Sequence, residues 1–290
     1  RQSGQALCIF NQFDELGNYL WHHEVTGPAM HEVLKSVMGR NDQYRGVISA
    51  TGSGGTIASG DYLKKAYPYS KIVASEALQC PTLLNNGFGA HRIEGIGDKH
   101  VPWIHNAKNT DFVVAIDDEI PMNLIRLFNE PTGMDYLVEK GVSQDLVDQL
   151  NLVGISGAAN LAGAIKFAKY YEMTENDVVL TILTDSMDMY QSRLQELTEE
   201  KGEFSPVDAA VTYQSKLQDL SIDYMEELNY YGKKRIHNLK YYTWVEQQGK
   251  TYEEIQQQWY EDSYWTSIID SADKIDELIE DFNRQTGLLD

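Results

Sequence analysis

The sequence of 290 residues contains few cysteines and no long apolar run. Its two cysteines, Cys8 and Cys80, are too few for the disulfide framework of a small secreted domain. No stretch of eighteen apolar residues is present, so no membrane span is expected. These absences favour a reducing cytoplasm as the location of the protein. The length is sufficient for one large or two modest domains with a substantial core.

Basic residues are also scarce. The chain carries 24 Lys and Arg residues against 44 Asp and Glu residues, which gives a formal net charge of -20. A surface of this sign repels the phosphates of nucleic acids, so we expect no nucleic-acid partner.

The first residue is Arg1, and no charged-then-apolar leader follows it. We therefore expect that sequence upstream of Arg1 belongs to the same protein.

The most informative segment that is present is a glycine-rich turn at residues 51–56, Thr-Gly-Ser-Gly-Gly-Thr. A short apolar run around Val47 and Ile48 precedes it, and a segment of helical character follows it. Free amide groups at such a helix start attract a phosphate, and glycines allow the main chain to approach it closely. The pattern predicts a phosphate-binding turn, with a turn that only connects strand to helix as the alternative.

Two familiar phosphate-binding motifs do not fit this turn. A Walker A loop requires Lys and then Ser or Thr after its last glycine, whereas Thr56 and Ile57 follow Gly55. The dinucleotide fingerprint requires a glycine where Ile57 stands, although Glu76 imitates the acid that binds the ribose. An NAD-type enzyme therefore remains only an alternative.

Apolar runs alternate with helical patterns along the first two thirds of the chain. Strands are expected at residues 6–10, 47–50, 72–75, 112–116 and 178–183. Helices are expected at residues 28–38, 121–128, 143–150 and 157–165, the last built from small residues. Strands separated by helices predict an α/β fold with a parallel sheet flanked by helices on both faces.

The pattern changes in the last third, where no convincing strand is found. We expect residues 1–195 to form a large α/β domain and residues 196–290 to form a helical C-terminal extension. A final amphipathic helix is predicted because Ile275, Leu278, Ile279 and Phe282 share one face. The aromatic residues of this extension are expected to pack on the α/β body or across a dimer; they include Trp244, Trp259, Tyr260, Tyr264 and Trp265.

Several short motifs occur in the order that is typical of one enzyme family. They are Asn11-Gln12-Phe13, Thr26-Gly27-Pro28, the turn at 51–56, Gly95-Ile96-Gly97, Gly154-Ile155-Ser156-Gly157-Ala158-Ala159, and Ile182-Leu183-Thr184-Asp185-Ser186 with Tyr190. In these motifs the chain, over about residues 5–195, resembles cysteine synthase and cystathionine β-synthase. These are fold type II enzymes dependent on pyridoxal 5'-phosphate, with a tryptophan synthase β-like fold.

The resemblance implies specific roles for residues of the chain. The phosphate of the cofactor would be held by the turn residues Gly52, Ser53, Gly54, Gly55 and Thr56.

The same resemblance places Ser156 against the pyridine nitrogen, where a neutral hydroxyl leaves the ring largely unprotonated; a helix N-cap is the alternative role for this serine. Gln12 would lie near the substrate carboxylate, and Gly95 and Gly97 would form a backbone strip beside the cofactor.

The departures from the family pattern matter as much as the matches. No lysine has a serine two positions before it, so the Ser-x-Lys motif of the Schiff-base lysine is absent and no catalytic residue is assigned in this chain. We expect that lysine upstream, in a small domain. Met187-Asp188-Met189 also replaces the usual Gly-Glu-Arg, which leaves the substrate open.

The resemblance implies β-replacement or β-elimination on a β-substituted L-amino acid of the O-acetylserine, serine or cysteine type, in a homodimer. The alternative from another class is a non-catalytic relative that binds a phosphate ligand. A metal site at His22, His23 and Glu24 is not expected, because adjacent residues of a strand point to opposite faces and no third ligand stands at a suitable spacing.

Overall fold

The computed structural model describes residues 9–287 and contains a five-stranded sheet in the order β4-β1-β2-β3-β5. The strands are β1 (Gln43–Ala50), β2 (Lys71–Ala77), β3 (Phe112–Ile116), β4 (Asp177–Thr181) and β5 (Met225–Glu227). All neighbours run parallel except β3 and β5, which run antiparallel. The predicted α/β fold with a parallel sheet is confirmed, as are four of the five predicted strands. The fifth, expected at residues 6–10, lies mostly outside the described residues.

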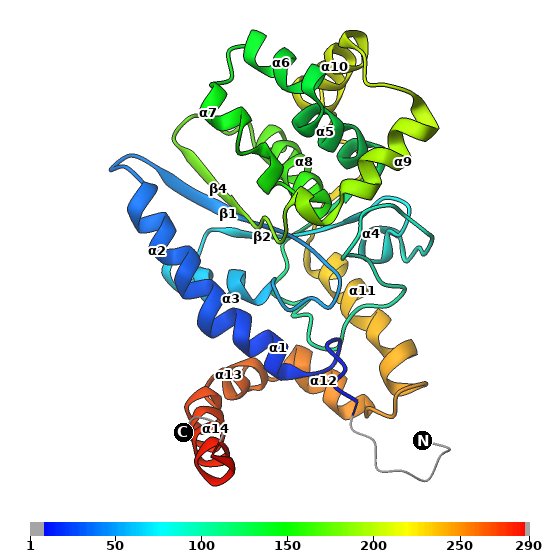
Figure 1. The fold of residues 1–290 in the computed structure, drawn as a ribbon. Helices are drawn as coiled ribbons and strands as arrows, with labels where there is room; N and C mark the ends of the chain where they lie inside the picture. The colour runs from blue at the N-terminus through cyan, green and yellow to red at the C-terminus, as the bar shows by residue number, and fades with distance from the viewer. Residues whose placement is uncertain (1–8, 288–290) are drawn as a thin grey trace.

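Helices cover both faces of this sheet, as its apolar strands require. They are α1 (Leu16–Trp21), α2 (Gly27–Val37), α3 (Ala58–Ala66), α4 (Thr82–Asn85), α5 (Glu119–Asn129), α6 (Pro131–Glu139), α7 (Gln144–Val147), α8 (Ile155–Tyr170), α9 (Gln191–Lys201), α10 (Pro206–Tyr213), α11 (Tyr230–Lys240), α12 (Tyr252–Tyr260), α13 (Ser263–Ile269) and α14 (Ala272–Thr286). Short 3-10 turns lie at Leu150–Leu152 and Met187–Met189, and π-helical turns lie at His22–Thr26, Gln214–Gln218 and Tyr241–Val245. Figure 1 shows α5, α8 and α10 on one side of the sheet and α1, α2 and α3 on the other.

The burial of the strands explains why they read as continuous apolar runs. Every residue of β3 is buried, as are six of the seven residues of β2. Ile48 and Val114 contribute to the core beneath α5 and α8, whereas Val47 and Ile72 contribute to the core beneath α2 and α3. The sheet therefore separates two apolar layers.

The order of the strands reverses beside β1. From β1 the chain passes through α3 to β2 and continues to β3, and then returns through α8 to β4 on the other side of β1. In an open parallel sheet, such a switch point leaves a crevice at the carboxyl ends of the two strands between which the order reverses. The loops after β1 and β4 meet at this crevice.

The prediction that no strand follows residue 195 is wrong. Residues Met225–Glu227 form β5, and Val113 of β3 is paired with Glu226. Three residues are too few to display the alternation by which strands are recognised in a sequence, and the partner strand lies far away in the chain. The division of the chain at residues 195 and 196 stays a prediction.

The aromatic residues of the last third pack largely as expected. Trp244 and Trp265 are buried in a cluster with Tyr19 and Trp103, which lie before residue 195. Tyr260, in contrast, is 62% exposed. The predicted amphipathic helix is present as α14, and its apolar face is exposed.

Within residues 9–287, no single helix has the length and apolar character needed to cross a bilayer. One bent pair, Gln144–Leu152 with Ile155–Tyr170, meets that criterion only when both parts are joined.

Candidate functional site

A cavity of about 380 Å³ lies at the switch point between β1 and β4. Its walls come from the end of β1, the glycine-rich turn, the start of α8 and the loop after β4. Eight of the nine residues that the sequence assigned to the site line this cavity: Gln12, Gly52, Ser53, Gly54, Thr56, Gly95, Gly97 and Ser156. The ninth, Gly55, is buried within the turn itself. The structure thus brings the assigned residues together, while their individual roles stay predictions.

The turn offers a set of free hydrogen-bond donors. Among residues 9–287, the amide groups of residues 52–57 have no hydrogen-bond partner, and the first amide to find one is that of Ala58, which donates to Gly55 O at 2.9 Å. Helix α3 starts at the same residue, so the positive end of its dipole adds to these donors. Such an arrangement suits the oxygen atoms of a phosphate group.

Glycine is required at two positions of this turn. Gly54 has φ of +81°, and a Cβ atom placed there would lie 3.2 Å from His105 Cβ. A Cβ atom on Gly55 would overlap the amide oxygen of Asn18. A side chain at Gly54 would strain the backbone that presents the free amides, and one at Gly55 would displace the Asn18 amide from the turn.

Asn18 on α1 holds the turn from outside, and the sequence analysis missed it. Its Nδ2 atom donates to Ser53 Oγ and to Gln12 O, both at 3.0 Å. It thereby joins the Asn-Gln-Phe motif to the glycine-rich turn. A lone asparagine in a helical pattern gives no signal in the sequence for such a contact.

The loop that carries Gly95 and Gly97 runs beside the turn. Both glycines have positive φ, +83° and +85°, and Gly97 N donates to Thr51 O at 2.9 Å. The carbonyl oxygen of Gly95 is 3.4 Å from the position that a Cβ atom on Gly52 would occupy. These glycines form a backbone wall close to the turn.

Helix α8 supplies the polar side chains of the opposite wall. Ser156 lies in its first turn and is 4% exposed. The N-cap position is occupied by Gly154, so the alternative of Ser156 as N-cap is wrong. One turn further on, Asn160 also lines the cavity and donates from Nδ2 to Ile182 O at 2.9 Å.

Two carboxyl groups lie at or near the cavity. Asp185 lines it, and its Oδ1 atom is buried without a hydrogen-bond partner among residues 9–287. Asp185 accepts a hydrogen bond of 2.6 Å from the hydroxyl of Tyr190, and burial together with this carboxylate raises the pKa of Tyr190 to about 12. Glu76 accepts hydrogen bonds of 2.9 Å from the amides of Leu83 and Leu84, and burial raises its pKa to about 7. Glu76 is thus committed to the start of α4, and this counts against a role in binding a dinucleotide ribose.

The geometry fits the group that the resemblance implies. The turn offers amide donors to a phosphate, Ser156 and Asn160 offer polar side chains to a ring, and the cavity lies within the usual size range of small-molecule sites. Pyridoxal phosphate carries a phosphate at one end and a heteroaromatic ring at the other. The residues present therefore match both ends of this molecule.

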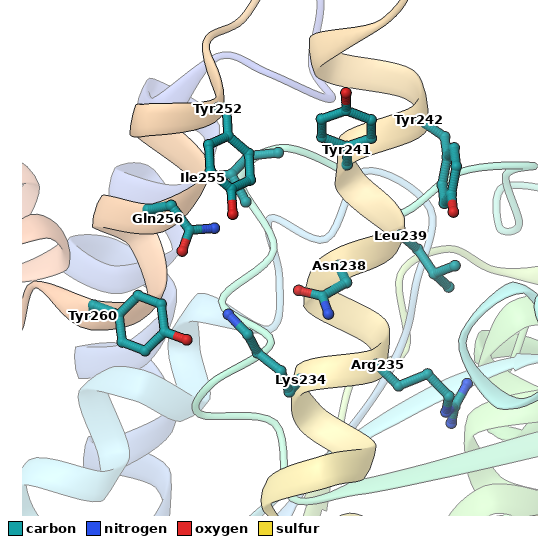
Figure 2. Close-up of a pocket in the computed structure, with 10 residues that line it drawn as sticks. All are labelled: Lys234, Arg235, Asn238, Leu239, Tyr241, Tyr242, Tyr252, Ile255, Gln256 and Tyr260. Carbon is teal, nitrogen blue, oxygen red and sulfur yellow. The ribbon is translucent and has the colours of Figure 1, made fainter.

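A larger pocket of about 540 Å³ lies elsewhere, between α11 and α12 (Figure 2). Lys234 and Tyr260 are among its lining residues, and none of the assigned site residues is. Lys234 makes cation–π contacts with Trp259 and Tyr260, since its ammonium lies 4.5 Å from each ring centroid. The smaller cavity is the candidate site, because the free amides and the switch point coincide there.

Comparisons with known proteins find relatives over part of the chain. No protein-family model matches the chain. It is 28% identical over 183 residues to the cysteine synthase of Staphylococcus aureus, which covers 62% of this chain and 51% of that protein. It is also 28% identical over 190 residues to the O-acetylserine-dependent cystathionine β-synthase of Bacillus subtilis, covering 65% of this chain and 53% of that protein.

Among solved structures, a hydrogen sulfide-producing enzyme from Fusobacterium nucleatum superimposes with a TM-score of 0.52 at 25% identity, covering 69% of this chain and 53% of the enzyme. The chain spans about half the length of the curated relatives it matches. It is a homologue of the cysteine synthase and O-acetylserine-dependent cystathionine β-synthase family over this partial coverage.

Proposed function

We propose that this homologue of cysteine synthases binds pyridoxal 5'-phosphate and forms part of an enzyme for β-replacement or β-elimination on a β-substituted L-amino acid. The observation that carries the proposal is the run of amides at residues 52–57, which have no partner in the described part of the chain and open into the cavity that the assigned residues line. The identity to enzymes of this family supports the same conclusion.

Each wall of the cavity has a proposed task. The turn residues Gly52 to Thr56 bind the phosphate through their amides, and Asn18 keeps the turn in place. Ser156 makes a hydrogen bond to the ring nitrogen. Gln12, on the exposed rim, orients the carboxylate of the amino acid substrate.

The cofactor, when bound, supplies an electron-withdrawing ring that makes the α-proton of an amino acid acidic and lets its β-substituent leave. The turn residues hold the phosphate of the cofactor, and Ser156 holds its ring nitrogen. The wall of Gly95 and Gly97 lies beside the ring and has no side chains that would fill the cavity. A fixed orientation of the reacting groups is the main contribution that such residues make to rate.

The lysine that carries the cofactor is proposed to lie outside this sequence, because no Ser-x-Lys motif is present. We further propose that the enzyme works in the cytoplasm as a homodimer. The substrate is proposed to be of the O-acetylserine, serine or cysteine type.

The test has two stages. In the first, this chain is titrated with pyridoxal 5'-phosphate and with inorganic phosphate by calorimetry; saturable binding of both is expected. Binding of phosphate without pyridoxal phosphate would instead support the non-catalytic relative.

In the second stage, the visible spectrum of the full-length protein is recorded before and after addition of O-acetylserine, serine or cysteine. A cofactor band that shifts with one of these amino acids identifies the substrate class. A full-length protein without such a band after incubation with pyridoxal phosphate would contradict the proposal.

A further inference from the structure

Two adjoining cavities lie around α11, away from the candidate site. The pocket of about 540 Å³ lies between α11 and α12 (Figure 2), and a second of about 290 Å³ lies between α11 and the loop that carries Lys99. Leu239 and Tyr242 line both cavities, so the two meet at these residues and form one groove across α11, the α11 groove. None of its lining residues lines the candidate site. The larger cavity alone has the usual size of a small-molecule site.

The charge of the α11 groove is opposite to that of the whole chain. The formal net charge is -20, yet no Asp or Glu is among the described residues that line the groove, whereas Lys99, Lys234 and Arg235 are. Lys99 is exposed and makes no ion pair within residues 9–287. Arg235 is paired with Glu226 at 2.8 Å, and the Lys234 ammonium is covered by two aromatic rings, so it contributes charge and not a direct contact. The groove therefore suits an anionic group, with Lys99 as its accessible partner.

Aromatic rings and free amides share the part of the groove between α11 and α12. The rings of Tyr241, Tyr252 and Tyr260 are 36%, 53% and 62% exposed. Figure 2 shows the amide of Gln256 on α12 pointing toward Asn238 on α11. Neither of these two side-chain amides makes a hydrogen bond within residues 9–287. Tyrosine rings can stack on a flat heteroaromatic group, and amides can bind the donors and acceptors on its edge.

A peptide fits this groove less well than a nucleotide. Peptides bind to an unpaired strand edge or as a helix in an apolar groove. The walls between α11 and α12 are helical, and Leu239 and Ile255 are the aliphatic residues among those that line the larger cavity. A nucleotide instead joins a flat base, with donors and acceptors on its edge, to an anionic tail.

We propose that the α11 groove binds a nucleoside diphosphate or triphosphate. The base lies among the tyrosines beside α12, and the phosphates extend past Leu239 and Tyr242 toward Lys99. This inference does not depend on the proposed function, because the two sites are lined by different residues.

The first test is calorimetric titration of the chain with ATP, GTP, CTP and UTP. Saturable binding of at least one is expected, and the corresponding nucleoside without phosphates should bind about tenfold more weakly. Lys99→Ala should weaken binding of the triphosphate about threefold and leave binding of the nucleoside unchanged. Lys35→Ala is the matched control, since Lys35 is exposed on α2 and does not line the groove. Its affinities should equal those of the unchanged chain.

The second test concerns the base. Tyr252→Leu keeps an apolar side chain but removes the ring, and should weaken binding of both the triphosphate and the nucleoside about tenfold. Tyr231→Leu is the control, because Tyr231 is 80% exposed on α11 and does not line the groove. Thermal unfolding shows which of the variants fold.

Gly54→Ala separates this groove from the glycine-rich turn. It should retain nucleotide affinity, because Gly54 lines only the other cavity. Loss of nucleotide affinity in folded Gly54→Ala, with normal affinity in Lys99→Ala and Tyr252→Leu, would place the nucleotide at the turn and overturn the proposal.

Two further outcomes overturn it. One is the absence of binding of all four triphosphates to the folded chain. The other is binding of a hexaglutamate peptide without binding of any nucleotide, which would identify a site for acidic peptides. Pyridoxal phosphate binding is titrated separately, so its failure counts against the proposed function and leaves this inference intact.

Discussion

The ammonium group of Lys240 donates a hydrogen bond of 2.7 Å to the backbone carbonyl of His105. Lys240 is fully buried and donates also to Trp103 O and Gln258 Oε1, so its three protons each have an acceptor. His105 is the residue against which Gly54 packs. The C-terminal third is thereby joined to the segment beneath the glycine-rich turn.

Replacement of Lys240 is expected to affect both stability and the turn. Lys240→Met removes three buried hydrogen bonds and leaves Gln258 Oε1 without a donor, whereas His105 O keeps the amide of Ala107 and Trp103 O keeps Gln258 Nε2. The free energy of unfolding should fall by about 2 kcal/mol. Because the His105 segment supports Gly54, the affinity for inorganic phosphate should also fall. Chemical denaturation and calorimetry measure the two effects.

The control for this prediction is Lys166→Met. Lys166 is also buried, and its ammonium donates to Asp223 O and Oδ1 at 2.7 and 2.8 Å. Its replacement should lower stability and leave phosphate affinity intact. Normal phosphate binding by a folded Lys240→Met variant would refute the link to the turn.

Gly54→Ala is expected to cost stability and ligand binding together. A positive φ of +81° is strained for alanine by about 1 kcal/mol, and the new Cβ atom presses on His105. Gly141→Ala is the control, since Gly141 has φ of +92° with open space around it. Both variants should melt at lower temperature, but only Gly54→Ala should lose phosphate affinity; equal affinities would count against the turn as the phosphate site.

Asn18→Ala is expected to weaken phosphate binding severalfold, because Ser53 loses the hydrogen bond that fixes the turn. The exposed Asn151, replaced by alanine, serves as the control. Calorimetric titration with inorganic phosphate compares the two variants. Identical affinities would show that the turn keeps its shape without Asn18.

Stability should fall as the pH is lowered from 6 to 5. Burial, followed by the charge of Lys240, lowers the pKa of His105 and of His237 to about 3, below the value of about 6.5 for an unfolded chain. The unfolded state therefore binds two more protons at these residues, so acid favours unfolding. Glu76 opposes this with one proton, because its folded pKa of about 7 exceeds its unfolded value. These three residues together contribute a slope of about 1.4 kcal/mol per pH unit.

Denaturant unfolding at pH 5, 5.5 and 6 measures this slope. Glu76→Gln removes the group that opposes the two histidines. The slope should therefore rise toward the value for an uptake of nearly two protons on unfolding. Stability that is constant or greater at pH 5 would disprove the assignment of neutral buried histidines.

Local pattern predicted most of the fold and the glycine-rich turn, whereas the family resemblance supplied the other residues assigned to the candidate site. The apolar run before Thr51 predicted β1, the small-residue segment predicted α8, and the glycine-rich turn lies between β1 and α3 as expected. These features depend on residues that are adjacent in the chain, so a single sequence displays them.

Contacts between distant segments could not be predicted in the same way. Lys240 reaches His105, Asn18 reaches Ser53, and Asn160 reaches Ile182 only after the chain has folded. A lysine or asparagine in a helical pattern normally indicates a solvent-facing position. The burial of Lys240 and Asn160, and the contact of Asn18 with the turn, follow from the tertiary fold alone.

The pairing of β3 with β5 has a consequence for synthesis on the ribosome. β3 leaves the exit tunnel about a hundred residues before β5, so its outer edge stays unpaired for much of translation. An unpaired apolar strand is a site for association with other nascent chains. Completion of the sheet, and of the support that Lys240 gives to the cavity, thus waits for the late residues.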